Sequence, residues 1–500
     1  MATEKILSLF STDTDKLNQS RTIYFIGIKG TGVCALAELA HHNGFNVLGS
    51  DIPEKFYTDK ILKKMNIPFY ENFEASHITK DIDLIIYSAA YSADSNVELA
   101  RAEELGIPTL KYTDALGAWS AKFDSTGICG VHGKTTTTAM CGVMVRAAAL
   151  PAQVLVGSAV IDFDEKSTIN LGDKYFIAET CEYRKHFMSF SPKRIILTSV
   201  ESDHQDYFPN YESIRDAFVE YCRLLPDGGQ LFYCADDPGA NEVAEIIKND
   251  RRNIELIPYG FSASGDYRIV SYNIGEGEAS FALAGVVAGG GGGEFKLAIP
   301  GRHEALNAAA AVALTMELAK NENKFPLSDE RMNALKNALA NFKSTKRRSE
   351  IIGKTGGIIF MDDYGHHPTA IKTTLEGIKQ FYSNRRLIVS FMSHTYTRTS
   401  CLLDDFARCF NDADIVIFHK IYSSAREDYS GGVNGYTLFE KTREIRDTDN
   451  KGKTYYYEEY DDAFKPLCEE LKSGDLFLTL GAGNNWPLGQ KLFDYFEVLS

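Results

Sequence analysis

The stretch from Gly130 to Thr138 constrains the fold of this 500-residue chain more than any other segment. It reads Gly-Val-His-Gly-Lys-Thr-Thr-Thr-Thr, and a helix is expected to continue from it through Ala139-Met140. Such a turn can bind phosphate, because small residues let backbone N–H groups converge and the helix dipole adds partial positive charge. Lys134 would reach the outer phosphates of a nucleotide, and a threonine hydroxyl would complete the shell of a magnesium ion. The full phosphate-loop pattern has a glycine where this chain has Ile128, so an ordinary glycine turn with a surface lysine remains the competing interpretation.

Length and composition predict a multidomain globular enzyme. A chain of 500 residues is too long to fold around a single hydrophobic core, so we expect about two to four domains. No apolar run approaches the roughly 18 residues that cross a bilayer, and the first twenty residues lack the apolar core of a signal peptide, so we expect a cytoplasmic protein without membrane insertion. The net charge of −15 argues against nucleic acid as a main partner. Nine cysteines without a Cys-x-x-Cys pair predict neither a zinc site nor a disulfide framework.

The first part of the chain predicts a parallel α/β sheet with a glycine-rich turn. Strands are expected at 22–28, 46–49 and 84–87, and a helix at 33–43. After the first strand, Gly30-x-Gly32-x-x-Ala35 satisfies the relaxed dinucleotide fingerprint, and Asp51 lies at a suitable distance. The same turn would hold the diphosphate of any nucleotide, and tight strand–helix packing would also explain it. An oxidoreductase hypothesis rests on this turn alone and leaves the Gly-Lys-Thr loop unexplained.

Two further parts also alternate strands and helices. Strands are expected at 175–178, 194–198, 230–234, 357–361, 387–390, 414–418 and 476–480. The glycine run 289–293 predicts a hairpin tip, and an alanine-rich helix is expected after Pro300-Gly301. Parallel sheets bind ligands at the carboxyl ends of their strands, so the polar residues that follow these strands are candidate site residues.

Carboxylates, imidazoles and guanidinium groups follow the predicted strands. The acidic and histidine candidates of the second part are Glu179, Glu182, Asp203, His204 and Asp206. A carboxylate and a neutral imidazole near a phosphate-loop threonine could hold Mg²⁺, although solvated loop charges are the alternative. Arg347-Arg348 could neutralise a transferring phosphoryl group, or form a solvated charge pair in a linker.

These motifs, taken in order, resemble those of the Mur ligase family over nearly the whole chain. The matching segments are 27–32, 130–137, 179–182, 201–207, 301–307, 346–348, 362–368, 394–399 and 481–483. The resemblance implies an α/β fold with three domains. These are an N-terminal Rossmann-like domain for a UDP-sugar (1–123), a central P-loop ATPase-like domain (124–343) and a C-terminal Rossmann-like domain for an amino acid (344–500).

The resemblance also implies an activity. ATP would phosphorylate the lactyl carboxylate of UDP-N-acetylmuramate, the amine of L-alanine would attack the acyl phosphate, and phosphate would leave. This is the first peptide-stem step of peptidoglycan synthesis, with ATP and Mg²⁺ as cofactors, small molecules as partners, and a monomer or homodimer as the enzyme. Phe218, in place of a lysine that later ligases carbamylate, and the run His394 to Thr399 favour the alanine-adding branch. A ligase with a different amino-acid or peptide acceptor is the alternative, and a non-catalytic nucleotide-binding module is a third hypothesis.

Individual roles follow from the resemblance. The catalytic set is Lys134, His204 and Arg347. The ATP-binding set is Gly130, Val131, His132, Gly133, Lys134, Thr135, Thr136, His303, Asn307, Arg347, Asp362 and Asp363. The metal set is Thr135, Glu179 and His204. The UDP-sugar set is Gly27, Lys29, Gly30, Thr31, Gly32, Asp51 and Ser88. The amino-acid set is Tyr364, His366 and Arg398, where a guanidinium can clamp a carboxylate.

The chain departs from the family pattern at several of these positions. Lys29 stands where glycine is usual, so it could crowd or strengthen the UDP turn. The other departures are Ser199, Glu304, Ser349 and His186.

Overall fold

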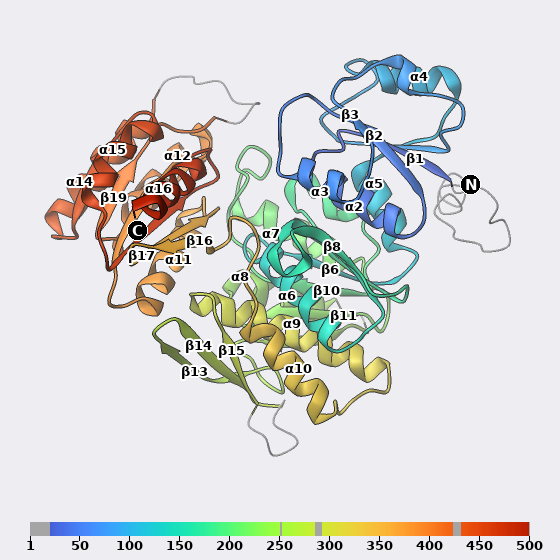
Figure 1. Ribbon diagram of the computed structural model, residues 1–500. Coiled ribbons are helices and arrows are strands. Elements are labelled where there is room, and N and C mark those ends of the chain that lie inside the picture. The colour runs from blue at the N-terminus through green and yellow to red at the C-terminus, as the bar shows by residue number, and fades with distance from the viewer. Residues whose placement is uncertain (1–20, 251–252, 286–292, 424–431, 500) are drawn as a thin grey trace. The chain divides into compact units, whose positions relative to one another are not determined.

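The computed structural model describes residues 21–250, 253–285, 293–423 and 432–499, and the chain divides into two compact units (Figure 1). The first unit comprises residues 1–201, 212–268 and 307–338, and the second comprises 202–211, 269–306 and 339–500. The predictions for the first twenty residues and for most of the glycine run 289–293 lie outside the described residues.

The first unit begins with a five-stranded sheet. Its strands are β1 (Thr22–Ile26), β2 (Asn46–Ser50), β3 (Phe69–Tyr70), β4 (Leu84–Tyr87) and β5 (Thr109–Lys111). They are all parallel and lie in the order β3-β2-β1-β4-β5. The helices between them are α2 (Thr31–His42), α3 (Thr58–Lys64), η2 (Ala75–His77), α4 (Val97–Leu105) and α5 (Tyr112–Ser120). Because the strand order reverses between β1 and β4, their carboxyl ends are the expected place for a ligand.

A seven-stranded sheet forms the rest of the first unit. Its strands are β6 (Asp124–Cys129), β7 (Ala152–Val160), β8 (Lys166–Asn170), β9 (Tyr175–Glu179), β10 (Arg194–Leu197), β11 (Gln230–Cys234) and β12 (Glu255–Tyr259). The order is β12-β11-β10-β6-β9-β7-β8, and only β8 runs antiparallel to its neighbour. The accompanying helices are α6 (Lys134–Ala147), η3 (Ile161–Phe163), η4 (Tyr183–Ser189), α7 (Tyr211–Cys222) and α8 (Pro238–Asn249).

Helix α2 joins these two sheets, because it packs against β2 on one side and against β7 and β8 on the other. Buried polar contacts reinforce this junction. Glu38 of α2 accepts a hydrogen bond from Thr168 Oγ1 of β8 at 2.9 Å. Gln153 of β7 donates to Asn43 Oδ1 at 3.0 Å and accepts from Trp119 Nε1 at 3.2 Å. Both sheets therefore belong to one compact unit.

The second unit contains a small antiparallel sheet and a larger mixed one. The small sheet consists of β13 (Ile269–Gly275), β14 (Glu278–Leu283) and β15 (Glu294–Leu297), in that order. The larger sheet has the strands β16 (Glu350–Thr355), β17 (Ile358–Asp363), β18 (Arg386–Phe391), β19 (Ile415–Phe418), β20 (Lys453–Tyr456) and β21 (Asp475–Leu480). Their order is β16-β17-β21-β18-β19-β20, with only the edge strand β16 antiparallel.

Helices cover the larger sheet, and α16 packs against β16, β17 and β21 (Figure 1). The helices of this unit are α11 (Pro368–Phe381), α12 (Tyr396–Cys401), α13 (Leu403–Arg408), α14 (Gly435–Thr448), η5 (Tyr460–Ala463), α15 (Phe464–Glu470) and α16 (Trp486–Leu499). Two helices lie mostly in the first unit, namely α9 (Arg302–Asn321) and α10 (Asp329–Ala340). The alanine-rich helix predicted after Pro300-Gly301 is α9 and is confirmed.

Every strand predicted from the sequence is present, and its ends differ from the prediction by at most two residues. None of the helices in the described parts of the chain has both the length and the apolar character needed to cross a bilayer.

Candidate active site

The segment between β6 and α6 forms a tight glycine loop at the N-terminus of a 14-residue helix. Gly130 has φ 136° and Gly133 has φ 78°, a region that favours glycine. A Cβ atom on Gly130 would lie 2.1 Å from Thr198 Oγ1, and one on Gly133 would lie 2.6 Å from Asn307 Oδ1. The loop is thus closed around both positions, and its glycines are required for steric reasons.

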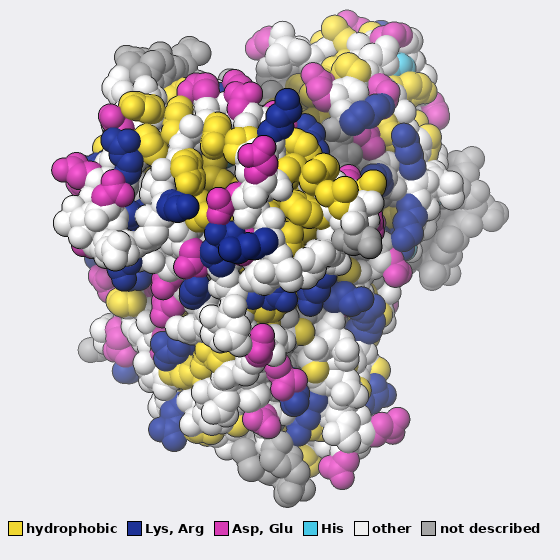
Figure 2. Space-filling model, turned by 60° about the vertical axis from the view of Figure 1, so that its left-hand side comes forward, with side chains coloured by type: hydrophobic (Ala, Val, Ile, Leu, Met, Phe, Trp, Pro, Cys, Tyr) yellow, Lys and Arg dark blue, Asp and Glu magenta, His cyan; other side chains and the backbone are white. Residues whose placement is uncertain are grey.

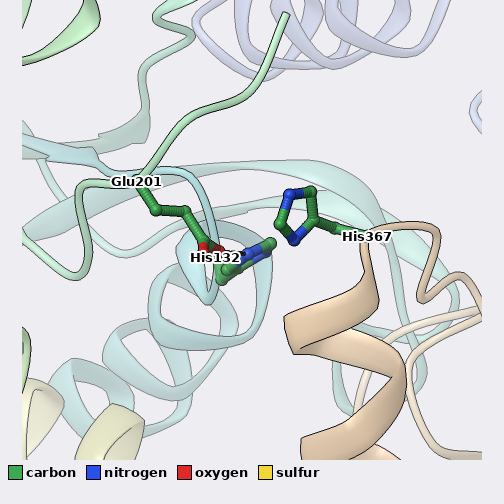
Figure 3. A group of neighbouring side chains, drawn as sticks. All are labelled: His132, Glu201 and His367. Carbon is green, nitrogen blue, oxygen red and sulfur yellow. Dashed lines mark hydrogen bonds and ion pairs between the residues drawn. The ribbon is translucent and has the colours of Figure 1, made fainter. Parts of the chain in front are cut away.

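The segment after β10 anchors this loop from outside. Ser199 accepts hydrogen bonds from Val131 N through its carbonyl at 3.0 Å and from His132 N through Oγ at 2.9 Å. The imidazole of His132 leaves the loop and contacts the carboxylate of Glu201 (Figure 3). Ser199, a departure from the family pattern, therefore holds the loop backbone.

Lys134, the first residue of α6, folds back over the loop. Its Nζ donates to Gly130 O at 2.5 Å and lies 2.9 Å from Glu182 Oε2. Glu182 follows β9 and is only 2% exposed. Burial alone would lower the pKa of Lys134, but the carboxylates of Glu182 and Glu179 nearby raise it. Lys134 is therefore a cation with a carboxylate partner, a pairing that the sequence analysis did not predict.

Thr135 and Glu179 meet beside this lysine. Thr135 Oγ1 donates to Glu179 Oε1 at 3.0 Å, and Gly157 N donates to Glu179 Oε2 at 2.9 Å. A Cβ on Gly157 would approach Glu179 Oε2 to 2.4 Å, so β7 passes close to the carboxylate. These two members of the predicted metal set lie together in the first unit. The third, His204, belongs to the second unit.

The predicted UDP-sugar residues gather at the carboxyl edge of the first sheet. Gly27 has φ 80°, and its N–H donates to Ser50 O at 2.8 Å. Lys29 N donates to Asp51 Oδ2 at 2.6 Å, which ties the turn to the end of β2. A Cβ on Gly27 would lie 2.9 Å from Ser88 Cβ, so the end of β4 closes the other side of the turn. The turn is thus flanked by the ends of β2 and β4.

Tyr112 is a neighbour of this turn that the sequence analysis missed. A Cβ on Gly32 would lie 2.7 Å from the Tyr112 hydroxyl oxygen, so the ring packs directly on the first turn of α2. Burial raises the pKa of Tyr112, and the charge of Glu179 adds to this effect. Tyr112 therefore lies near both the glycine turn and the carboxylate beside the phosphate loop. No pattern in the sequence marks it.

In the second unit, the end of β17 carries a network of charged residues. Arg347 Nε donates to Asp362 Oδ2 at 3.0 Å, and Arg347 NH2 donates to Gly481 O at 2.7 Å. Its guanidinium lies 5.0 Å from the centre of the Tyr364 ring. Burial raises the pKa of Asp362 to about 6, although Arg347 opposes the shift. The Asp363 carboxylate accepts from Ser349 N and Gly365 N, each at 2.7 Å, so it closes the loop that follows β17.

Arg398 and Asp203 form a buried ion pair in the same unit. Arg398 NH2 and Nε donate to Asp203 Oδ1 at 3.0 and 3.2 Å. Burial would raise the pKa of Asp203, but Arg398 beside it holds that pKa well below its ordinary value. Burial lowers the pKa of His366, and the Arg398 charge lowers it further, so His366 is a neutral imidazole. Tyr364 and His366 contact each other, with ring centres 5.2 Å apart. The predicted amino-acid residues therefore lie near one another, together with Asp203.

Two residues of the predicted ATP-binding set, His303 and Asn307, lie one turn apart on α9. Asn307 Oδ1 accepts from Thr137 Oγ1 at 3.1 Å and so contacts the phosphate-loop helix. His303 Nε2 lies 3.4 Å from Glu304 Oε1. Burial would lower the pKa of His303, but Glu304 raises it. Glu304, another departure from the family pattern, thus favours a charged His303.

Family models match the chain in three consecutive segments. They are described as Mur ligase family, catalytic domain (residues 22–124), Mur ligase middle domain (128–315) and Mur ligase, glutamate ligase domain (347–483). The chain therefore belongs to the Mur ligase family.

Similar proteins match the chain almost from end to end. It is 50% identical to UDP-N-acetylmuramate–L-alanine ligase of Treponema pallidum (strain Nichols). The alignment spans 475 residues and covers 95% of this chain and 96% of the relative. It is 40% identical over 480 residues to the protein of the same name from Borreliella burgdorferi, with 95% and 98% covered. Among solved structures, UDP-N-acetylmuramate–alanine ligase of Thermotoga maritima matches with a TM-score of 0.73 at 23% identity, covering 96% of this chain and all of the other. The predicted three-domain α/β fold is thereby confirmed.

Proposed function

We propose that this chain is the ligase that joins L-alanine to UDP-N-acetylmuramate, with ATP as the energy source. The observation that carries the proposal is the 50% identity, over 95% of the chain, to a protein named for this reaction. The glycine loop before α6 supports it, because the loop places Lys134 and Thr135 at a helix N-terminus. The reaction would be the first peptide-stem step of peptidoglycan synthesis, and we propose that it takes place in the cytoplasm.

The chemistry explains why a phosphate loop belongs in an amide ligase. A carboxylate repels an incoming amine lone pair and has no good leaving group. Phosphorylation of the lactyl carboxylate by ATP supplies one, and the amine of L-alanine then displaces phosphate. We propose that Lys134 and Arg347 stabilise the negative charge that spreads over the phosphoryl oxygens during transfer. We assign His204 to the same reacting centre by its place in the family motif.

The residues beside the phosphate loop fit a magnesium ion. Magnesium prefers hard oxygen ligands, and the Thr135 hydroxyl and Glu179 carboxylate oxygens lie 3.0 Å apart. The contact from Gly157 N orients the carboxylate before any ion arrives. When bound, the ion would neutralise phosphate charge. We propose Thr135, Glu179 and His204 as the residues that hold it.

The remaining predicted roles are kept as proposals. ATP would contact residues 130–136 together with His303, Asn307, Asp362 and Asp363, and UDP-N-acetylmuramate would contact Gly27, Gly30, Thr31, Gly32, Asp51 and Ser88. Lys29, the seventh member of the predicted UDP-sugar set, belongs to the same turn, but its side chain is enclosed. L-Alanine would contact Tyr364, His366 and Arg398.

We also propose the domain boundaries 1–123, 124–343 and 344–500, supported by the start of β6 at Asp124. Basic and acidic side chains both appear on the face shown in Figure 2. The net charge of −15 favours small-molecule substrates over nucleic acid.

Phosphate release measures the proposed reaction directly. The full chain is mixed with ATP, Mg²⁺ and UDP-N-acetylmuramate, and L-alanine, glycine, L-serine or a stem tripeptide is added in separate reactions. We expect the fastest release with L-alanine, together with a product that is heavier by one alanyl residue in mass spectrometry. If only the tripeptide stimulates phosphate release, the chain is a ligase that adds a peptide and not L-alanine. No stimulation by any acceptor would refute the ligase proposal.

A further inference from the structure

The side chain of Lys29 points away from the substrate turn that contains it. Its backbone lies between Gly27 and Gly30, yet the side chain has an exposed fraction of 0%. Lys29 does not adopt a positive φ, so a residue with a Cβ fits this position without backbone strain. The lysine therefore does not crowd the turn. Its ammonium is also enclosed too completely to reach a ligand there.

The ammonium instead fastens the segment between β2 and α3. Its N–H groups donate to Ile52 O at 2.8 Å, Glu54 O at 3.0 Å and Glu71 Oε1 at 3.4 Å. The carboxylate of Asp59 lies 3.2 Å away as an ion-pair partner. All three ammonium protons are thus used within the protein. Two of them hold backbone carbonyls of one exposed segment.

The backbone of Lys29 holds the same segment. Its N–H donates to Asp51 Oδ2 at 2.6 Å, and its carbonyl accepts from Thr58 Oγ1 at 2.6 Å. Tyr57 reaches back to the turn as well, because its hydroxyl donates to Thr31 Oγ1 at 3.1 Å. The segment from Asp51 to Thr58 is therefore attached to the glycine turn at both of its ends and, through the ammonium, in its middle.

Burial of a lysine is unfavourable unless the charge is fully paired and hydrogen-bonded. Here the ammonium has one nearly buried partner, since the Asp59 side chain is 7% exposed. A nonpolar side chain at position 29 would leave the Asp59 charge and two carbonyls without this donor. The arrangement thus favours one conformation of the segment over the alternatives that an exposed loop would otherwise sample.

We propose that Lys29 is a positioning residue for the nucleotide-sugar. It acts from behind the turn, and it holds the segment 51–58 so that turn and segment form one preformed wall of the UDP-sugar site. This inference rests on the proposed function, because it takes the glycine turn to be the UDP-sugar site. It assigns Lys29 no contact with the substrate through its ammonium.

The test combines a charge-neutral double variant with a matched control. Lys29→Met alone would strand the Asp59 carboxylate, so Lys29→Met/Asp59→Asn removes both charges together. Lys60→Met is the control, because Lys60 is an exposed lysine on α3 that lies just outside the segment 51–58. Calorimetry without ATP or alanine gives the dissociation constant of UDP-N-acetylmuramate for each full-length protein. ATP binding is measured in parallel.

We expect the double variant to bind UDP-N-acetylmuramate at least about tenfold more weakly, with ATP binding unchanged. Lys60→Met should bind both like the wild type. A folded double variant with wild-type affinity for UDP-N-acetylmuramate would overturn the proposal.

Hydrogen exchange on the wild type tests the proposal without any variant. The proposal can therefore still be tested if the double variant does not fold. The amides of Ile52 and Phe56, which donate to Asp51 Oδ1 at 2.8 Å and to Asp59 Oδ2 at 2.7 Å, should be protected before substrate is added. Protection that arises only with substrate would overturn the preformed wall. Failure of the proposed function has a different signature. A wild type that binds the UDP-sugar but ligates no amino acid refutes the ligase, and leaves the Lys29 proposal standing. A wild type that does not bind the UDP-sugar overturns both.

Discussion

Replacement of Glu38 by glutamine is expected to change how the stability of the first unit depends on pH. Glu38 is fully buried on α2, where it accepts hydrogen bonds from Thr168 Oγ1 at 2.9 Å and from Ser167 N at 3.4 Å. Burial raises the pKa of Glu38 to about 7, and these hydrogen bonds and the charge of Lys166 offset only part of that effect. The carboxyl group lies where the helix that follows the glycine turn meets β8 of the second sheet.

The sign of the effect follows from which state binds the proton more tightly. The folded carboxyl group has a pKa of about 7 and the unfolded one a value near 4.5. The stabilising contribution of the proton is therefore complete below about pH 4.5, and is lost as the pH rises to about 7. A difference of about 2.5 pH units corresponds to about 3 kcal/mol of unfolding free energy. Glu38→Gln has no proton to lose, so it should keep this contribution at pH 8.

Thermal unfolding between pH 4.5 and 8.5 measures the difference. For a cooperative unit of roughly 300 residues, about 3 kcal/mol corresponds to about 5 °C in the midpoint. The midpoint of Glu38→Gln relative to the wild type should therefore rise by about 5 °C across this pH range. Glu103→Gln is the control, because Glu103 is an exposed glutamate on α4 and its replacement should shift the curve little. Parallel pH curves for wild type and Glu38→Gln would refute the reasoning.

Four further substitutions test the site. Lys134→Ala should lower kcat at least about 100-fold in the phosphate-release assay while UDP-sugar binding in calorimetry stays unchanged, and retained turnover would contradict its role. Glu179→Gln should raise the Mg²⁺ concentration for half-maximal rate at least about tenfold, whereas an unchanged magnesium titration would count against the metal site. Arg398→Lys should raise KM for L-alanine at least about tenfold and leave KM for the UDP-sugar unchanged, since an ammonium cannot offer two parallel donors. Gly32→Ala would place a Cβ 2.7 Å from the Tyr112 hydroxyl, so wild-type affinity for the UDP-sugar would refute the close packing at this turn.

Most parallel strands inside the sheets could be predicted because each is a short apolar run that ends in glycine or polar residues. The prediction omits β7 and the edge strands β3, β5, β8, β12, β16 and β20. β7 follows α6 after only four residues, and β8 is a five-residue strand at the edge of its sheet. Edge strands such as β8 and β16 are stabilised by one neighbour only, so they need no continuous apolar run and give a weak signal. Their existence depends on tertiary pairing.

The glycines of the site could be predicted from local sequence, but the side-chain partners could not. Gly130 and Gly133 are required because their backbone φ angles are positive and because Thr198 and Asn307 lie too close for a Cβ atom. Both requirements select glycine at fixed positions of a short motif, so they can be recognised in the sequence. The partner of Lys134 lies 48 residues away in the chain, and Asp203 lies 195 residues from Arg398. No spacing rule connects residues at such separations, since the fold alone brings them together. The direction of the Lys29 side chain depends in the same way on a segment that follows a different strand.

The cations proposed to meet substrate anions differ from Lys29 in their exposure. Each has a carboxylate partner within the protein, as Lys29 does, but each also keeps part of its side chain exposed. The pairs are Lys134–Glu182, Arg347–Asp362 and Arg398–Asp203, with the cation side chains 14%, 26% and 9% exposed. A carboxylate partner keeps a largely buried cation charged and in place before substrate arrives. An incoming phosphate or carboxylate then exchanges one anionic partner for another and does not have to dehydrate a free cation. The Lys29 side chain has no exposed surface and donates all three protons within the protein, so it has nothing left to exchange. Exposure of the cation therefore distinguishes residues suited to substrate contact from one suited to shaping the wall behind it.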